Sequence, residues 1–462
     1  MVRYRWDRLD AAMVMAMISL LVVIGEVIAR GDQLGIRALE FRPVDTASSR
    51  TTIQVQFEET VDLASVRAHF RIAPAVAGDF SVQDNRVTFR PSSPLPAGKD
   101  YAVTLTPGIV GVTGREFKQV IQWHFRVAAH RVIYLAPAFA LTQNLYAIDP
   151  AQPDAPQQLT DVQPATVVDF DVAPDGSSIV FAERQPGSTI DLMMWDAASG
   201  TSRLFYACRD AQCTNPVWRP DGGAIAFERV ELNTSLEGGH AGVPRVWIYD
   251  LVTNSVHLLF NTSERLGYAP HWSPDGKRIA VYDDSVGGIV VHDFSTRAEQ
   301  VIKTVQGIVG AFSPDGRWLF FPRKLQFNAN QYATHQILVD TSTDPFALHS
   351  LIPDTDPSDD SEMVWTPDTT GVIVARRLSS ARGINVPQIY EVNLANGQAV
   401  PLVVDESYAS SALSLSPDGA LLASQRLPVS APNARNEVWL YDLKNHQLRR
   451  LASDARTPKW MS

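Results

Sequence analysis

From about residue 130 onward, short apolar runs alternate with turn-forming residues in a repeating order. A Pro-Asp-Gly turn, or a degenerate form of it, recurs every 40 to 54 residues. An apolar side chain stands two residues before each proline and another five residues after it. This pattern predicts a strand that enters each tight turn and a second strand that leaves it. The prolines are Pro174, Pro220, Pro274, Pro314, Pro367 and Pro417.

A second pattern marks a third strand in each repeat, an apolar run that closes on Asp or Asn before a short turn. Another strand follows each run, so the unit holds four strands in about 45 residues, which is typical of a propeller blade. The chain has six Pro-Asp-Gly turns but seven runs of this kind. The runs close at Asp149, Asp196, Asp250, Asp293, Asp340, Asn393 and Asp442.

The extra third strand comes first, and no first strand precedes it. The chain ends in "TPKWMS", where Trp460 is placed as Trp218 is in "NPVWRP". We therefore expect the last residues to supply the innermost strand of the blade that begins at about 131. The pattern predicts a seven-bladed propeller over residues 130–462, with six blades as the alternative if the first unit is not a full blade.

Residues 36–127 show another pattern, with short alternating runs such as "TIQVQFEE", "RVTFRP" and "YAVTLTP" separated by turn clusters. Strands at this spacing over about 90 residues predict a β-sandwich. The segments "VQFEETVDLASV" and "FRPSSPLPAGKDYAVTLTPGIVGVTGREF" and the closing "WHFRV" resemble the bacterial Ig-like domain of the SbsA type. That resemblance implies a spacer or adhesive module without catalytic residues.

The repeat "PVWRPDG" resembles that of TolB-like propellers, and we interpret it as architectural. Its tryptophans are expected to pack between blades, and its aspartates to bond the turn backbone. TolB itself has another kind of N-terminal domain, so the resemblance concerns the propeller alone. The predicted fold class is all-β, with an N-terminal transmembrane helix, an Ig-like sandwich and a propeller.

The N-terminal segment 11–29 is apolar except for Ser19 and Glu26, and three arginines precede it within residues 1–10. A stretch of this length can just span a bilayer, with the arginines on the cytoplasmic side. A cleaved signal peptide is the alternative. We expect a cytoplasmic tail, a single-pass anchor in the cell membrane, and an extracytoplasmic body.

Charge and cysteine content restrict the possible partners. The net charge of −10 and the pI of about 5.5 argue against nucleic-acid binding, which needs a basic surface.

Cys208 and Cys213 lie close together, and an exported context favours a disulfide between them. A zinc site would need further ligands that are not nearby.

In a propeller, the connections from the second to the third strand of a blade, and from the fourth strand to the first strand of the next blade, lie on one face. Several of these connections are long here, and long loops on a rigid scaffold are where binding usually occurs. Five of the six Pro-Asp-Gly blades carry an arginine at the end of the second strand on this face, and Asp283 takes the place in the sixth. Such guanidinium groups suit carboxylate or phosphate partners. The alternative is pairing with nearby acids such as Glu183 or Glu228. The candidate ligand-binding residues are Arg184, Arg229, Arg323, Arg376 and Arg426.

The loop 352–363 concentrates four aspartates that offer oxygen ligands for calcium, but it lacks the glycine of an EF-type loop. A solvated acidic loop is the preferred interpretation, and no cofactor or metal is expected. The four are Asp354, Asp356, Asp359 and Asp360.

No nucleophile elbow, Walker loop, dinucleotide motif or zinc-protease motif occurs in the chain. We expect a non-catalytic exported binding or scaffold protein that presents its loop face to a protein or an anionic envelope polymer. The alternative is a polysaccharide lyase or glycoside hydrolase with its site at the channel mouth, which two facing carboxylates would favour.

Overall fold

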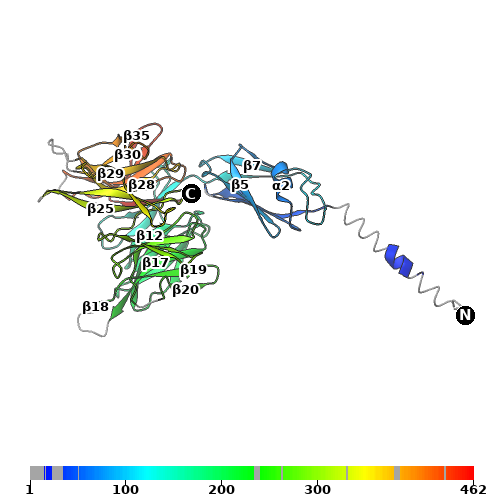
Figure 1. The fold of residues 1–462 in the computed structure, drawn as a ribbon, viewed down its shortest axis with the longest axis horizontal. Helices are drawn as coiled ribbons and strands as arrows, with labels where there is room; N and C mark the ends of the chain where they lie inside the picture. The colour runs from blue at the N-terminus through cyan, green and yellow to red at the C-terminus, as the bar shows by residue number, and fades with distance from the viewer. Residues whose placement is uncertain are drawn as a thin grey trace. The chain divides into compact units, whose positions relative to one another are not determined.

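The computed structural model of the chain describes residues 15, 17–22, 35–49, 51–233, 240–261, 264–328, 331–378, 386–430 and 433–461. The chain divides into two compact units, which are treated separately below. The first comprises Met1–Ala47 and Thr51–Ala128, and the second comprises Ser48–Arg50 and Ala129–Ser462. Both are built from strands, as predicted for an all-β chain (Figure 1), and most of the strand pairs are antiparallel.

The predicted N-terminal transmembrane helix is not supported. Among the residues that the structure describes, no helix has both the length and the apolar character needed to cross a bilayer. In the segment 11–29 the structure describes Met15 and 17–22, which are helical. The rest of that segment, and the predicted tail over 1–10, lie outside the described residues.

The first unit is a sandwich of two four-stranded sheets, as predicted from its alternating runs. Apolar side chains alternate with polar ones along each strand, as in β3, where every second residue is buried. Phe57, Val103, Phe117 and Phe125 form part of its core. One sheet contains β1 (Ala38–Arg42), β3 (Ile53–Phe57), β6 (Arg86–Pro91) and β5 (Gly78–Gln83). The other contains β2 (Asp45–Ala47), β8 (Ile121–Val127), β7 (Asp100–Leu105) and β4 (Phe70–Ala73).

A short helix, α2 (Leu63–His69), connects β3 to β4 in this unit. Asp62 caps its N-terminus, because the Asp62 carboxylate accepts a hydrogen bond of 2.7 Å from the Ser65 backbone N–H. The Ser65 hydroxyl in turn accepts from the Val110 backbone N–H at 3.0 Å, which fixes the helix to the loop after β7.

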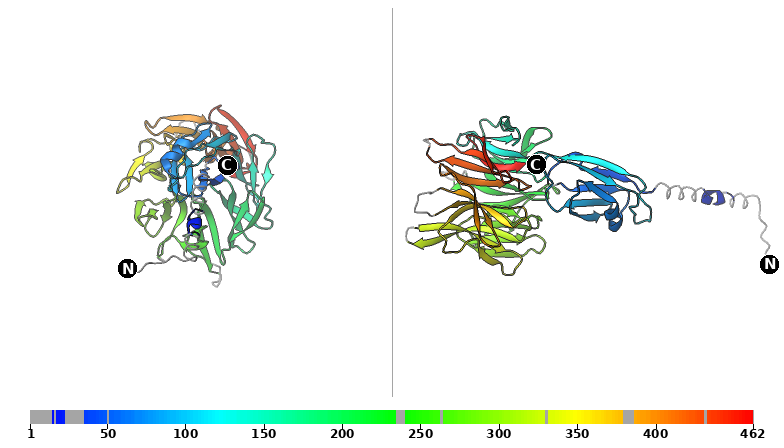
Figure 2. Two further views of the ribbon diagram at one scale, coloured as in Figure 1. Left: turned by 90° about the vertical axis from the view of Figure 1, so that its right-hand side faces the viewer. Right: turned by 90° about the horizontal axis from the view of Figure 1, so that it is seen from above.

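The second unit is a β-propeller whose blades are arranged around a common axis (Figure 2, left). We number the blades in chain order, and seven are present in the described part of the chain. Blade 1 contains β36 (Arg456–Met461), β9 (Arg131–Ala136), β10 (Asn144–Ile148) and β11 (Gln157–Gln158). Blade 2 contains β12 (Thr166–Val172), β13 (Ser178–Arg184), β14 (Ile190–Asp196) and β15 (Thr201–Tyr206). Blade 3 contains β16 (Ala211–Trp218), β17 (Ala224–Asn233), β18 (His240–Ala241), β19 (Arg245–Asp250) and β20 (Ser255–Leu258).

The remaining blades follow the same plan, except that the inner position of blade 5 is filled by a segment with a single bridge, Phe312 to Leu319. Blade 4 contains β21 (Tyr268–Trp272), β22 (Arg278–Asp283), β23 (Gly288–Asp293) and β24 (Glu299–Lys303). Blade 5 contains β25 (Trp318–Asn328), β26 (Gln331–Asp340) and β27 (Ala347–Ser350). Blade 6 contains β28 (Asp359–Trp365), β29 (Gly371–Arg377), β30 (Gln388–Asn393) and β31 (Ala399–Val403). Blade 7 contains β32 (Tyr408–Leu415), β33 (Leu421–Pro428), β34 (Glu437–Asp442) and β35 (Gln447–Ala452).

Blade 1 joins the two ends of the propeller's polypeptide. The last strand, β36, pairs antiparallel with β9, which is the first strand of the unit, and Trp460 lies opposite Val132. Trp460 packs in a buried cluster with Tyr134 of blade 1 and with Ala423 and Leu440 of blade 7. The C-terminal strand therefore seals the junction between blades 7 and 1.

The repeated tryptophans pack between blades, as the sequence predicts, and three of the four also donate hydrogen bonds there. The Trp218 indole N–H is buried without a hydrogen-bond partner among the described residues. The other three indoles each bond a backbone carbonyl at the inner position of the preceding blade. Trp272 bonds Val217 at 3.3 Å, Trp365 bonds Ala311 at 3.0 Å, and Trp460 bonds Ser414 at 2.9 Å.

The turn aspartates have the predicted role. Each accepts a hydrogen bond from the backbone N–H two residues later, at 2.8 to 3.2 Å, which stabilises the turn. They are Asp175, Asp221, Asp275, Asp315, Asp368 and Asp418.

Candidate functional site

Ion pairs within the molecule engage four of the five arginines predicted to bind an anion. Arg376 makes two hydrogen bonds to the Asp360 carboxylate, at 2.6 and 2.8 Å, and both side chains are buried. Arg229 pairs with Glu231 at 2.8 Å, and Arg323 pairs with Asp354 at 2.8 Å. Arg184 is exposed, and no ion pair to it occurs among the described residues. The acids that pair with these arginines are not Glu183 and Glu228, the two that the alternative interpretation suggested.

Arg426 is completely buried between two aromatic rings. Its guanidinium carbon lies 4.4 Å from the centre of the Tyr408 ring and 4.9 Å from that of Trp439. Its Nη2 donates to Asp405 at 3.0 Å. Stacking of this kind is favourable for a planar guanidinium group, so Arg426 holds the core of blade 7 together.

The aspartates of the loop 352–363 are also engaged individually. Asp354 accepts from Arg323 and Ser350, Asp356 from the Ser358 backbone N–H, and Asp359 from Arg377. Asp360 is the partner of Arg376. Within the described ranges, no group of three or more His, Cys, Asp or Glu side chains is arranged to hold a metal ion.

The inner strands share a local irregularity that the sequence analysis did not find. Six of them shift register against the second strand of their blade, which is the mark of a β-bulge. In four of these strands the residue three positions before the packed aromatic or leucine has a positive φ of 48° to 54°. Those residues are Asn215, Ala269, Ala412 and Thr457. A bulge leaves backbone N–H groups without a ladder partner, so each needs an acceptor from elsewhere.

Polar side chains of the preceding blade supply those acceptors. Glu228 of blade 3 accepts from the Ala269 N–H of blade 4 at 2.7 Å, and also from the Asn215 side chain at 2.9 Å. Glu362 of blade 6 accepts from the Leu413 N–H of blade 7 at 3.1 Å. Burial raises the pKa of both Glu228 and Glu362, although these hydrogen bonds oppose the rise. The two glutamates therefore fasten neighbouring blades to each other.

The same arrangement recurs at two further junctions. Asp171 of blade 2 accepts from the Trp218 N–H of blade 3 at 2.9 Å. Gln425 of blade 7 accepts from the Thr457 N–H of blade 1 at 3.2 Å, so a neutral amide can take the place of a carboxylate. Among the described residues, a side chain of the preceding blade thus accepts from an inner-strand N–H at four of the seven junctions.

Lys459 introduces a cation among these inner-strand acids. Its Nζ donates to the Phe170 carbonyl at 2.6 Å and to Asp171 at 3.1 Å, and a third of its side chain is exposed. Burial acts to lower the pKa of Lys459, but Asp171 and Asp169 outweigh it and the pKa is raised. Burial and the Lys459 charge lower the pKa of His271 to about 4, so this imidazole is neutral at pH 7.

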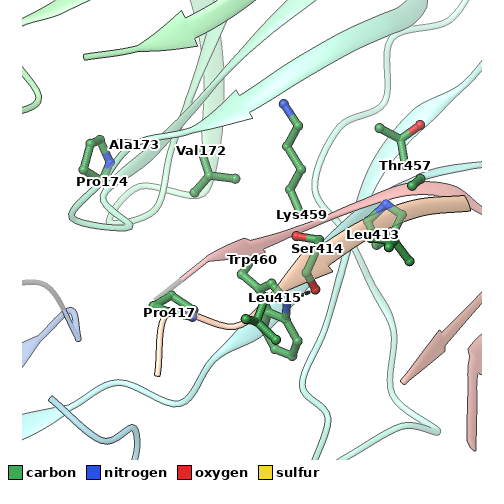
Figure 3. A pocket seen from close by; sticks show the side chains of 12 residues that line it. Val172, Ala173, Pro174, Leu413, Ser414, Leu415, Pro417, Thr457, Lys459 and Trp460 are labelled. Carbon is green, nitrogen blue, oxygen red and sulfur yellow. Dashed lines mark hydrogen bonds between the residues drawn. The ribbon is translucent and has the colours of Figure 1, made fainter. Parts of the chain in front are cut away.

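A cavity of about 470 Å³, here named the axial cavity, opens beside Lys459. It lies between the inner strands of blades 1, 2 and 7, at the ends that lead into the Pro-Asp-Gly turns. Figure 3 shows the Lys459 side chain extending from β36 away from Leu415 and Trp460, with Val172 and the turn at Pro174 to one side of it. The wall consists of Val172–Pro174, Ala412–Leu415, Pro417 and Thr457–Trp460.

His130 and Asp418 lie next to one wall of the axial cavity. The His130 Nε2 is 3.4 Å from an Asp418 carboxylate oxygen, and the His130 ring meets the Trp460 ring edge-on. Burial acts to raise the pKa of Asp418, but hydrogen bonds from His130 and Ser416 lower it to about 2. The first residues of the propeller are therefore tied to the Pro-Asp-Gly turn of blade 7.

Cys208 and Cys213 form a disulfide that is fully buried between blades 2 and 3. The Cys208 N–H donates to Asp191 at 2.7 Å, and Gln212 pairs in parallel with Ile190. Because of that parallel bridge, the strands of the two blades form one continuous sheet.

Sequence reasoning missed Lys459, Asp171 and His271 as a group, although the signal was present. Each stands directly before the apolar residue that packs between blades, Trp460, Val172 or Trp272. Alignment of the repeats on that residue would have shown that three of them carry an ionisable side chain at the same position.

Two protein families match the chain. The family described as "TolB beta propeller domain" matches residues 245–459, and the family described as "Bacterial Ig-like domain" matches residues 32–127. Both resemblances drawn from the sequence motifs are therefore confirmed. No curated protein matches the chain.

Several solved propeller structures are similar to this one. TolB from Acinetobacter baumannii is 15% identical over 85% of this chain and 82% of its own, with a TM-score of 0.42. Puromycin hydrolase is 15% identical over 71% of this chain and 52% of its own, with a TM-score of 0.50. An oligogalacturonate lyase in complex with manganese is 15% identical over 70% of this chain and 84% of its own, with a TM-score of 0.49. At such identities the likeness concerns the fold and carries no activity over to this chain.

Proposed function

Because the chain combines a TolB-type β-propeller with a bacterial Ig-like domain, we propose that it is a non-catalytic, exported binding protein. Its propeller holds a protein or an envelope polymer at the axial cavity. The observation that carries this proposal is the position of Lys459, a partly exposed cation on the wall of a cavity that offers both polar and apolar surface.

The use of the acids at the blade junctions supports binding rather than catalysis. A lyase or hydrolase at the axis would need a carboxylate that is free to exchange a proton with its substrate. Here the oxygens of Glu228, Glu362 and Asp171 accept hydrogen bonds from backbone N–H groups of the next blade. Movement of any of these side chains toward a substrate would leave an inner-strand N–H of the next blade without its acceptor, which costs free energy.

The wall of the cavity suggests the chemistry of the partner. Leu415, Pro417 and Trp460 offer an apolar surface, and the Lys459 ammonium, which bonds Phe170 and Asp171, offers a positive charge elsewhere on the wall. An anionic group flanked by apolar atoms complements this arrangement, as in an acidic side chain within an extended apolar peptide. The buried disulfide supports export, since disulfides persist in oxidising compartments.

The test places a photo-crosslinking amino acid at the cavity wall, at Pro417, in the full chain in its native envelope. A matched variant carries the same group at Val252, which is 83% exposed and lies in a turn between the outer strands of blade 3. We expect a discrete crosslinked partner from the Pro417 variant and none from the Val252 variant.

A second substitution, Lys459→Met, should remove the Pro417 crosslink while the chain still folds. Circular dichroism and thermal unfolding check the fold of each variant. The proposal is contradicted if Pro417 captures nothing, or if Lys459→Met leaves the captured partner unchanged.

A further inference from the structure

Blade 5 departs from the other blades at its inner side. In blade 6, β28 pairs with β29 from one end to the other. In blade 5 the described residues provide the Phe312 to Leu319 bridge and hydrogen bonds between the backbones of Gly310 and Ala311 and that of Phe320. The strand β25 then continues beyond the end of its inner partner.

The backbone groups of β25 that face inward can be identified from these bonds. Phe320 bonds the inner segment through both its N–H and its carbonyl, so Pro322 and Lys324, which alternate with it, face the same way. Pro322 has no N–H to donate, and proline in a sheet is typical of an edge. The Lys324 N–H donates to the side-chain Oε1 of Gln306 at 2.9 Å, and no described residue donates to the Lys324 carbonyl. The side-chain amide of Gln306 thus takes the place of the backbone carbonyl that an inner strand would supply.

Exposed apolar side chains flank this edge. Val305 is 93% exposed and Ile308 is 55% exposed, and both lie on the loop that carries Gln306. The Lys324 ammonium lies 4.5 Å from the centre of the Tyr332 ring, which is itself half exposed. Within the described residues, the edge therefore combines a carbonyl that has no donor, an N–H that a side chain accepts, two apolar side chains and a positive charge.

We propose that this edge of β25, at Lys324, is a docking site for an extended segment of a partner protein. The segment pairs antiparallel with β25 and displaces Gln306, so that the backbone of the partner replaces the side-chain amide. Strand addition of this kind takes its affinity from main-chain hydrogen bonds and its specificity from alternate side chains. An acidic residue of the segment lies beside Lys324, and its apolar residues cover Val305 and Ile308.

This site is distinct from the axial cavity. The loop that carries Gln306 connects the fourth strand of blade 4 to the inner position of blade 5, which places it at the end opposite the Pro-Asp-Gly turns. The inference does not depend on the proposed function, because it uses no residue of the axial cavity.

The test measures fluorescence anisotropy of a labelled synthetic peptide of roughly seven residues that alternates valine with glutamate, a common strand length. The control peptide has the same composition with a central proline. We expect the wild-type chain to bind the first peptide and not the second. Lys324→Pro removes the inward N–H and leaves the outward bonds to β26, so it should weaken binding about tenfold or more. Lys324→Ala keeps the N–H, and its loss should be about threefold.

Gln306→Ala supplies a variant whose strand is untouched. It frees the Lys324 N–H from its internal partner, so binding should strengthen by about threefold. The inference is overturned if the peptide fails to bind the wild-type chain, or if Gln306→Ala weakens binding. It is also overturned if Lys324→Pro folds and binds equally well. Concentration-dependent dimerisation that Lys324→Pro abolishes would assign the edge to a second copy of the chain and would likewise contradict it.

Discussion

Arg376 in blade 6 and Arg323 in blade 5 occupy the same position of the repeat, four residues after the first buried residue of the second strand. Arg376 is buried and makes two hydrogen bonds to the buried Asp360. The side chain of Arg323 is 37% exposed and pairs with Asp354, which is 58% exposed. One position in the repeat thus gives a core ion pair in one blade and a surface ion pair in the next.

The inner strand accounts for the difference. Asp360 belongs to β28 and lies directly opposite Arg376 in the ladder, so the inner strand brings the acid to the arginine. Among the residues that the structure describes, blade 5 has no paired inner strand at this level, and Arg323 reaches instead to a loop that follows β27. The repeat fixes where an arginine stands, and the inner strand decides whether it is buried.

The largest effect is expected when a regular blade loses its inner strand, since this tests whether such a blade can do without the strand as blade 5 does. Deletion of residues 456–462 removes β36 from blade 1 and exposes the buried cluster around Trp460. We expect the chain to lose much of the unfolding free energy of the propeller, which for a domain is about 5–15 kcal/mol in total. Differential scanning calorimetry measures this, and an unchanged transition would show that blade 1 tolerates the loss as blade 5 does.

The paired arginines give the next largest effect. Arg376→Met leaves Asp360 buried without its partner and should cost about 3–5 kcal/mol of unfolding free energy. Arg323→Met breaks an exposed pair and should cost about 0–1 kcal/mol. Chemical denaturation of the two variants under one condition tests the contrast. Equal costs would refute the view that the inner strand sets the burial of this position.

A smaller effect is expected at the junction between the two blades. Trp365→Phe keeps the aromatic ring but leaves the Ala311 carbonyl without its indole donor, so it should cost about 1–2 kcal/mol. Trp247, which is partly buried and makes no hydrogen bond through its indole within the described residues, serves as the control position. Trp247→Phe should be nearly neutral in the same denaturation experiment. A Trp365→Phe variant as stable as the wild type would show that the indole bond contributes nothing.

The smallest effect concerns Glu362, the interblade acceptor of blade 6. Its pKa is raised in the folded chain, so between the unfolded and folded pKa values the native state holds a proton that the unfolded state has released. The unfolding free energy therefore falls as the pH rises through this window. Glu362→Gln keeps an oxygen acceptor for the Leu413 N–H and should flatten this part of the pH profile. If the unfolding free energies of the wild type and the Glu362→Gln variant changed in parallel from pH 4 to 8, Glu362 would not be the source of this pH dependence.

The sequence predicts those parts of the fold whose causes are local. The turn aspartates bond a backbone N–H two residues away, and the tryptophans recur with the blade period, so both can be found by counting along the chain. Pro322 in "LFFPRK" was a usable sign that β25 is an edge, because a proline cannot donate to a ladder.

The interblade caps could not be predicted in this way. Glu228 and the Ala269 N–H that it accepts from are 41 residues apart, and Glu362 and Leu413 are 51 residues apart. Nothing near either glutamate indicates a bulge in the next blade, since the bulge is set by the register of another pair of strands. Apart from Glu231, which follows Arg229 by two residues on the same strand, the partners of the arginines are unpredictable for the same reason, because the acids come from neighbouring strands and loops.

The continuous sheet of blades 2 and 3 has a mechanical consequence. A closed ring can open only where adjacent blades slide past each other or separate. At the junction of blades 2 and 3, a disulfide and a strand pairing that the two blades share both oppose such movement. We expect blades 2 and 3 to move as one rigid unit. Opening of the ring should therefore occur at the junctions where side-chain contacts alone join neighbouring blades.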